Sequence, residues 1–276
     1  MKQLIIIPML AAFGSYRSAG AQTNAGLEKT FELVRTSLTV HEPVVVKFTA
    51  TNHLPVAVTT YKSLDTRLTR PDGRAPDGPP SQSPDYFGPN PILPLAPFET
   101  RSTLLLLNKT YYFDVPGRYA LNVTNYDETP GPPPKQVISL PYQSLTIDIS
   151  PRDPARLSQV CGQLETAIDA GPTTAEGYEA AEALAYMDDP VAVPYIARVL
   201  ATDSRMFRWR LFPALARIGD AAAAETLISY LWSADEEERT LARRDLSFIL
   251  QATSDPSTMS WIIFARIVDW ARSSFH

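Results

Sequence analysis

The chain has 276 residues, of which 45% are hydrophobic and 20% are charged, and its formal net charge is −5. This length is long for one domain and natural for two, with enough residues to build a core in each. Because binding to nucleic-acid phosphates requires a dense basic face, the negative charge argues against a nucleic-acid partner.

The first 21 residues have the pattern of an export signal. Lys2 gives a positive start, an apolar run extends from Leu4 to Phe13, and Ala19-Gly20-Ala21 supplies the small residues that a signal peptidase requires. Cleavage near Ala21 would leave Gln22 as the first residue. The run is too short to span a bilayer. We therefore expect a periplasmic or extracellular protein with no membrane span in the mature chain. A buried N-terminal strand is the alternative interpretation.

Residues 25–150 are predicted to form a β-rich domain. Short runs of β-branched and aromatic residues alternate with polar ones, and Pro, Asn, Asp and Gly separate the runs. About seven such strands in some 120 residues predict a sandwich of two sheets. The clearest runs are residues 37–40, 44–50, 56–61, 102–107, 119–123 and 145–149.

One turn in this region resembles a motif of immunoglobulin-like sandwiches. Asp114 and Gly117 precede Tyr119, as in the turn before a late strand of that fold, where the tyrosine hydroxyl ties the corner. The segment 38–44, with Glu42-Pro43 between two strands, is similar to the opening of many bacterial sandwich domains. The resemblance implies an immunoglobulin-like β-sandwich. A sandwich of another topology is the alternative.

A proline-rich stretch from Pro71 to Pro91 interrupts the predicted strands. Proline cannot donate a hydrogen bond to a neighbouring strand, so this segment is expected to form a long loop. Loops at the end of a sandwich often bind partners, which makes Tyr86 and Phe87 candidate contact residues. The alternative is a poorly ordered excursion of the chain.

Residues 151–276 are predicted to be helical. Apolar residues recur three and four positions apart, and we expect about seven helices. Three Asp-Pro pairs mark helix starts, because Asp caps free amides and Pro suits the first helical position. Two further starts match the capping-box pattern. The pairs begin at Asp153, Asp189 and Asp255, and the boxes begin at Thr173 and Ser233.

The helical region repeats every 31 residues. Leu184, Leu215 and Leu246 coincide at this spacing. In the helix that follows each of the first two, Ile196 aligns with Leu227, 31 residues later. Equal spacing of buried positions is what stacked helix pairs require, because each pair must pack on the last in the same way.

The segment Ala214 to Asp220, followed by an apolar helix ending at Leu231, closely resembles a HEAT repeat of the short bacterial, bilin-lyase-like kind. Pro213 lies where such repeats often have a proline in the first helix. The resemblance covers about 100 residues and implies a short α-solenoid used for protein contact. No bilin chemistry follows from it, since no matching catalytic residues are present. The predicted fold class is two domains, all-β then all-α.

Candidate contact residues in the solenoid lie on the second helix of each pair. In such arrays the second helices line the concave surface, and Tyr and Arg are the residue types that anchor interfaces. Tyr195, Arg198 and Tyr230 are therefore the predicted contact residues. The last helix, residues 256–275, is apolar nearly all round, and we expect it to cap the array with most faces buried. An exposed dimer contact is the alternative.

The residues needed for catalysis are sparse. Only His41, His53 and His276 are present, and no nucleophile motif lies near them. A zinc site of His41, Glu42 and His53 is conceivable, but no metal or cofactor is expected. The single cysteine, Cys161, cannot form an intramolecular disulfide and is expected to be buried.

These features predict an exported, non-catalytic protein that binds an unidentified protein partner. One alternative is a sandwich that works as an inhibitor or carbohydrate-binding module through Tyr86 and Phe87. Another is a hydrolase with an unrecognised pair of carboxylates. A basic cluster of Arg205, Arg208 and Arg210 could meet an acidic partner or offset the net charge.

Overall fold

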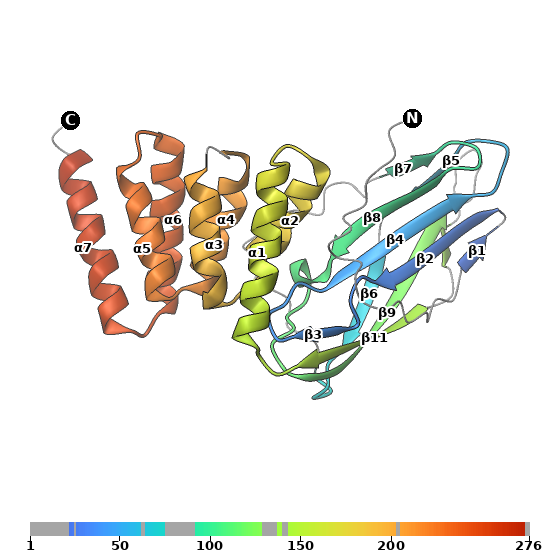
Figure 1. Ribbon diagram of the computed structural model, residues 1–276, viewed down its shortest axis with the longest axis horizontal. Coiled ribbons are helices and arrows are strands. Elements are labelled where there is room, and N and C mark those ends of the chain that lie inside the picture. Colours follow the sequence, from blue (N-terminus) through green and yellow to red (C-terminus); the bar gives the residue numbers. More distant parts are fainter. Residues whose placement is uncertain are drawn as a thin grey trace. The chain divides into compact units, whose positions relative to one another are not determined.

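The computed structural model describes residues 22–24, 26–61, 64–74, 92–128, 137–139, 143–202 and 205–273. The chain divides into two compact units, Met1–Asp153 and Pro154–His276. In the described part of the chain, the first unit is rich in strands and the second contains seven α-helices (Figure 1).

The first unit contains an antiparallel sheet of four strands in the order β1-β2-β4-β8. Alternate residues of β4 are buried, as expected for a strand with one face on a core. Phe31 lies opposite Phe48 in the register of β2 and β4, and their rings stack with centroids 5.1 Å apart. The strands are β1 (Gln22–Asn24), β2 (Leu27–Leu33), β4 (Val45–Asn52) and β8 (Thr100–Leu106).

A second sheet is built around the long strand β9, which pairs with β6, β10 and β11; β3 pairs with β11 in parallel. β5 and β7 form a separate ladder. The strands are β3 (Ser37–Thr39), β5 (Val58–Tyr61), β6 (Leu64–Thr69), β7 (Ile92–Leu95), β9 (Gly117–Glu128), β10 (Val137–Ser139) and β11 (Gln143–Ser150). The described residues thus hold eleven strands where the sequence predicted about seven.

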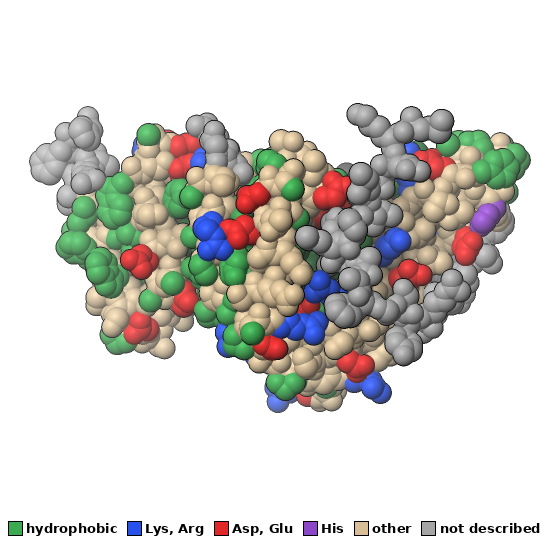
Figure 2. Space-filling view, viewed as in Figure 1, with side chains coloured by type: hydrophobic (Ala, Val, Ile, Leu, Met, Phe, Trp, Pro, Cys, Tyr) green, Lys and Arg blue, Asp and Glu red, His purple; other side chains and the backbone are tan. Residues whose placement is uncertain are grey.

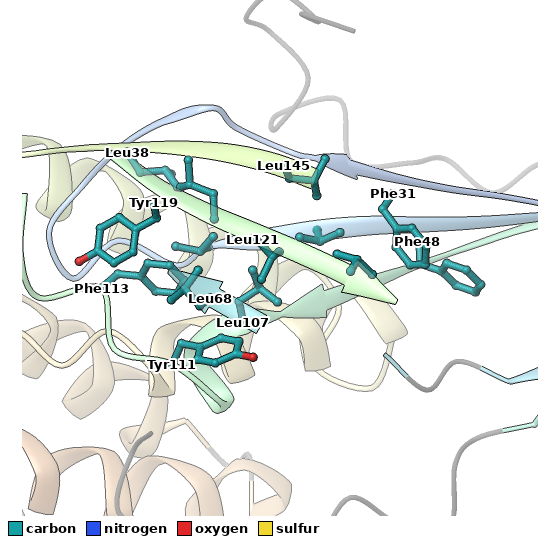
Figure 3. Packing of buried hydrophobic residues seen from close by; sticks show 14 of the residues in the cluster. Phe31, Leu38, Phe48, Leu68, Leu107, Tyr111, Phe113, Tyr119, Leu121 and Leu145 are labelled. Atoms are coloured by element: carbon teal, nitrogen blue, oxygen red, sulfur yellow. The ribbon is translucent and has the colours of Figure 1, made fainter. Parts of the chain in front are cut away.

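Both sheets contribute to one hydrophobic core. Phe31 and Phe48 from the first sheet and Tyr119, Leu121 and Leu145 from the second belong to the same buried cluster (Figure 3). Along β11, buried and exposed residues alternate without exception. Burying these large side chains supplies the main favourable contribution to the stability of the unit.

The turn before β9 forms as its sequence predicted. Gly117 has a φ of 138°, and a Cβ there would lie 2.7 Å from the Pro71 side chain, so only glycine fits. The Tyr119 hydroxyl donates to the Val115 carbonyl at 2.7 Å. The predicted tie between this tyrosine and the turn is therefore confirmed.

The helices of the second unit pack in two rows (Figure 1). One row contains α1 (Pro154–Ala170), α3 (Val193–Ala201), α5 (Ala221–Ser229) and α7 (Pro256–Ser273). The other contains α2 (Ala175–Ala185), α4 (Arg205–Ile218) and α6 (Glu236–Ala252). Short 3₁₀ helices lie at Leu107–Lys109 (η1), Pro190–Ala192 (η2) and Tyr230–Trp232 (η3).

The helix starts are mostly where the Asp-Pro pairs predicted them. α1, η2 and α7 begin at Pro154, Pro190 and Pro256. The two predicted capping boxes are wrong in register. Thr174 rather than Thr173 caps α2, because its hydroxyl accepts from the Gly177 amide, and Asp235 rather than Ser233 caps α6.

The repeat of buried positions continues through the whole unit. Ile196 and Leu227 are buried in α3 and α5, and 31 residues after Leu227 the buried Thr258 holds the same place in α7. α7 is therefore the second helix of a third pair, formed with α6, and follows α3 and α5 in its row.

Candidate interaction surfaces

Two of the predicted contact residues, Tyr195 and Arg198, lie together on α3 and bond to α1. The Tyr195 and Ser158 hydroxyls are 2.6 Å apart. Arg198 donates two hydrogen bonds to the Glu165 carboxylate, at 2.5 and 2.9 Å, and its guanidinium lies 4.5 Å from the Tyr195 ring centroid. The bond to Glu165 raises the pKa of Arg198. Over half of the Arg198 side chain, 55%, still remains exposed.

Tyr230 has a different environment from the other two predicted residues. It begins η3, and its ring packs on Phe212 of α4 with centroids 4.9 Å apart. Burial raises the pKa of its hydroxyl. Tyr230 thus contributes mainly to packing between α4 and η3. Tyr86 and Phe87, the other candidate contact residues, lie outside the described residues.

The arginines of α4 bind carboxylates of neighbouring helices, which argues against a free basic patch. Arg208 pairs with Glu238 of α6, and Arg210 pairs with Glu182 of α2. Arg210 also lies over the Tyr178 ring at 4.5 Å. Most of this cluster is therefore neutralised within the chain. The side chain of Arg205, the third member, lies outside the described residues.

These pairs follow the repeat. Arg210 and Glu182 are 28 residues apart, and Arg198 and Glu165 are 33 apart, so each pair joins helices about one repeat from each other. Arg243 of α6 instead forms a link within the third pair, with two bonds to Asp269 of α7 at 2.7 and 3.0 Å. Charged side chains thus tie successive helices together.

The outer face of α7 is apolar and exposed, which corrects the expectation that this helix is buried on most faces. Ile262 and Ala265 pack inward, whereas Trp261, Phe264 and Ile267 are 66%, 61% and 57% exposed. Figure 2 shows hydrophobic side chains gathered over this helix. The cause is its place at the end of its row: α7 packs on α5, α6 and η3, and no later described helix covers its other side.

A second exposed apolar site lies on the β-rich unit, at a place that the sequence pattern did not predict. Phe98 is 68% exposed and has a φ of 59°, a left-handed conformation that costs a non-glycine residue free energy. The buried Asn52 amide donates to the carbonyls of Val56 and Ala96, at 2.8 and 2.9 Å. It thereby joins the loop that exposes Val56 to the turn that exposes Phe98.

Two of the three residues that suggested a metal site have other partners. Glu42 is buried, accepts from the Thr39 amide at 3.0 Å and pairs with Arg35 at 2.9 Å. His53 pairs instead with Glu28 at 2.9 Å. Across the described residues, no group of three or more His, Cys, Asp or Glu side chains could hold a metal ion.

Cys161 is buried in α1, as predicted, with its Sγ 3.5 Å from the Met187 Sδ. Burial raises the pKa of the thiol to about 12, so the group stays protonated at physiological pH. A protonated, buried thiol is a poor nucleophile.

Comparison with known proteins gives one family match. The model for HEAT repeats matches residues 164–247, which run from within α1 to within α6. No curated protein matches the chain. None of the described helices is long and apolar enough to cross a membrane.

Solved structures resemble the chain only weakly. The β-glucosidase from Listeria innocua in complex with isofagomine is 12% identical over 45% of this chain, with a TM-score of 0.27, and the chain spans 16% of its length. The C-terminal domain of wzt is 13% identical, with a TM-score of 0.33 and coverage of 55% of this chain and 91% of that domain. Scores this low support no inference about fold or function.

Proposed function

We propose that this chain is an exported, non-catalytic scaffold that binds a protein partner through its helical unit. The observation that supports this most is the match to HEAT repeats over α1 to α6, because HEAT repeats commonly mediate protein–protein contact. On this proposal the helices form a short α-solenoid, and the row of α1, α3 and α5 provides the binding face.

The chemistry of this row suits protein contact. Arg198 is fixed by Glu165 and lies over Tyr195, so little side-chain freedom is lost when a partner binds. Arg and Tyr are frequent anchors at interfaces. Glu225 and Ser229 of α5 are exposed on the next helix of the row. The row thus presents side chains of both charges beside an aromatic ring.

The proposal for the first unit is an immunoglobulin-like β-sandwich. Two sheets share one core, and the Tyr119 hydroxyl bonds to backbone four residues upstream, as in the tyrosine corner of that fold. Export is proposed from residues 1–21, which lie outside the described residues. Mass spectrometry of the mature N-terminus would test this directly.

The binding face can be tested by photo-crosslinking in the native cell envelope. A photoreactive amino acid at Pro194 or Glu225 would sample the proposed row, and the same group at Thr240, exposed on α6, would sample the other row. We expect Pro194 and Glu225 to capture the same protein and Thr240 to capture none. Capture from Thr240 alone, or none from any position, would contradict the proposed face.

One observation favours a second candidate, in which the β-rich unit binds a partner through its loops. Phe98 takes its positive φ as the third residue of a turn closed by the Glu99 amide and the Ala96 carbonyl, a position that favours glycine, yet a mostly exposed ring stands there. Strained residues concentrate at functional sites. Phe98→Gly would relieve the strain and remove the ring. Under this candidate the variant loses the captured partner while its stability rises by about 1 kcal/mol. Unchanged capture would exclude Phe98 as a contact.

A further inference from the structure

The outer face of α7 has a regular composition along the helix. Ser257, Ser260, Phe264 and Ile267 follow one another at spacings of three and four, so they lie on one side. All four are exposed, and none is charged. Small residues occupy the first half of this stripe and large ones the second half, with Trp261 beside it.

The repeat allows the outer face of α7 to be compared with the equivalent positions of α3 and α5. Trp261 holds the position that Tyr230 holds one repeat earlier and Val199 two repeats earlier. Val199 is 1% exposed and Tyr230 is half-buried, whereas Trp261 is mostly exposed. Burial at this position therefore falls along the array. Phe264 of the stripe replaces the polar Ser233 of the preceding repeat, so the apolar character of this face is particular to α7.

From this pattern we propose that α7 pairs antiparallel with α7 of a second copy of this chain, forming a two-fold homodimer. In that arrangement Phe264 of each helix lies beside Ser260 of the other, and Ile267 lies beside Ser257. Each large side chain meets a small one, so the stripe is complementary to itself, as a two-fold interface requires. An uncharged stripe also fits an identical partner, because no like charges are brought together.

Burying the serines in this contact costs little. The Ser260 hydroxyl already donates to the Pro256 carbonyl at 2.7 Å, so its donor is satisfied within the helix. Arg266 is exposed but lies on the flank of the helix, away from the stripe. The Ser260 hydroxyl would therefore keep its hydrogen bond when the stripe is covered.

The exposed area sets the expected affinity. A fully covered aromatic side chain contributes about 150–250 Å². The exposed apolar side chains of this face are Trp261, Ile263, Phe264 and Ile267. From their exposed fractions, the two α7 helices of a dimer would together bury on the order of 1,000 Å². This is at the lower end for specific interfaces. We expect a dissociation constant on the order of 10 µM.

Sedimentation equilibrium of the mature full-length chain, from about 1 to 200 µM, tests the proposal. The average mass should rise from one chain toward two, with little change between low and high salt. Phe264→Glu should raise the dissociation constant at least about 30-fold. Phe98→Glu, which alters an equally exposed aromatic residue on the other unit, should leave the dimer intact. A wild-type chain that stays monomeric, or a Phe264→Glu dimer, would overturn the proposal.

A mixing experiment tests the antiparallel register. Phe264→Lys and Ser260→Glu chains should each be monomeric alone, because each places a charge against an uncharged stripe. Mixed, they should form a heterodimer, since the introduced lysine of one chain would face the introduced glutamate of the other. A mixture that stays monomeric would refute antiparallel pairing. Binding of a monomeric wild-type chain to phosphatidylcholine vesicles, lost in Phe264→Glu, would show a lipid-binding face instead.

Discussion

The two units of this chain are stabilised in different ways. The β-rich unit relies on one apolar core to which both sheets contribute, and within it the Phe31 and Phe48 rings stack across the paired strands β2 and β4. The helical unit adds arginine–carboxylate pairs that link helices about one repeat apart. A core of distant contacts specifies a single closed structure. A series of local links instead stacks each helix on its neighbours, and among the described helices α7 is covered on one side only.

The largest expected effect tests whether the two units unfold independently of each other. Phe48→Ala removes a fully buried ring from the β-rich core and should lower the free energy of unfolding of that unit by about 3–5 kcal/mol. All four tryptophans follow residue 153, so tryptophan fluorescence reports only the helical unit. In urea unfolding, the circular dichroism transition of the β-rich unit should shift while the fluorescence transition stays. Equal shifts would contradict separate cores.

The next prediction concerns the arginine links. Arg210→Ala should destabilise the helical unit by about 2–4 kcal/mol, because it removes the guanidinium that pairs with the largely buried Glu182 carboxylate. The fluorescence transition in urea measures this loss. The control is the double variant Arg210→Met with Glu182→Met, which replaces the pair with apolar side chains and should recover most of the stability. If Arg210→Ala is as stable as wild type, the Arg210–Glu182 pair does not stabilise the packing of α4 on α2.

A smaller effect is expected at the tyrosine tie in the β-rich unit. Tyr119→Phe removes the hydroxyl that donates to Val115 but keeps the buried ring in the core. The free energy of unfolding should fall by about 1–2 kcal/mol. Circular dichroism in urea would measure the change, and the tryptophan transition serves as the internal control. A neutral result would mean that the ring alone fixes the turn.

The smallest effect is a pH dependence at Asp245 of α6. This carboxylate fills the repeat position held by Ala183 and Ala214, and burial raises its pKa, with Arg244 opposing. A raised pKa in the folded protein favours folding below the ordinary value of about 3.9, and this contribution is lost as pH rises through the folded pKa. Asp245→Asn should therefore gain stability relative to wild type between about pH 3 and pH 7. If the difference in unfolding free energy between Asp245→Asn and wild type stays constant over this pH range, the raised pKa of Asp245 is contradicted.

Sequence reasoning was most accurate for the helical unit because its contacts are periodic. The 31-residue spacing predicted which leucines are buried, and seven helices were expected and found in the described residues. The same reasoning chose Tyr195 and Arg198 as contact residues at non-core positions, and the structure adds that both bond to α1. Which side of α1 meets α3 depends on helix packing, and the periodicity of a single helix does not determine it.

The strands were harder to predict because their pairing partners are distant in sequence and their alternation of apolar and polar residues is less regular. β2 was missed because Glu28, Lys29 and Glu32 interrupt its apolar residues, although Lys29 is fully buried. The exposed Phe98 could not have been found either, because a left-handed conformation is not expected of phenylalanine. Similarly, an almost wholly apolar α7 gave no sign of which face would stay exposed.

Hydrogen exchange of the mature chain, measured alone and bound to the partner captured by photo-crosslinking, tests the central claim most directly. If the helical unit is the binding scaffold, amides of α3 and α5 should exchange more slowly in the complex. The β-rich unit should be unchanged. Protection confined to the loops around Val56 and Phe98, with α3 and α5 unaffected, would contradict the account and transfer the binding role to the β-rich unit.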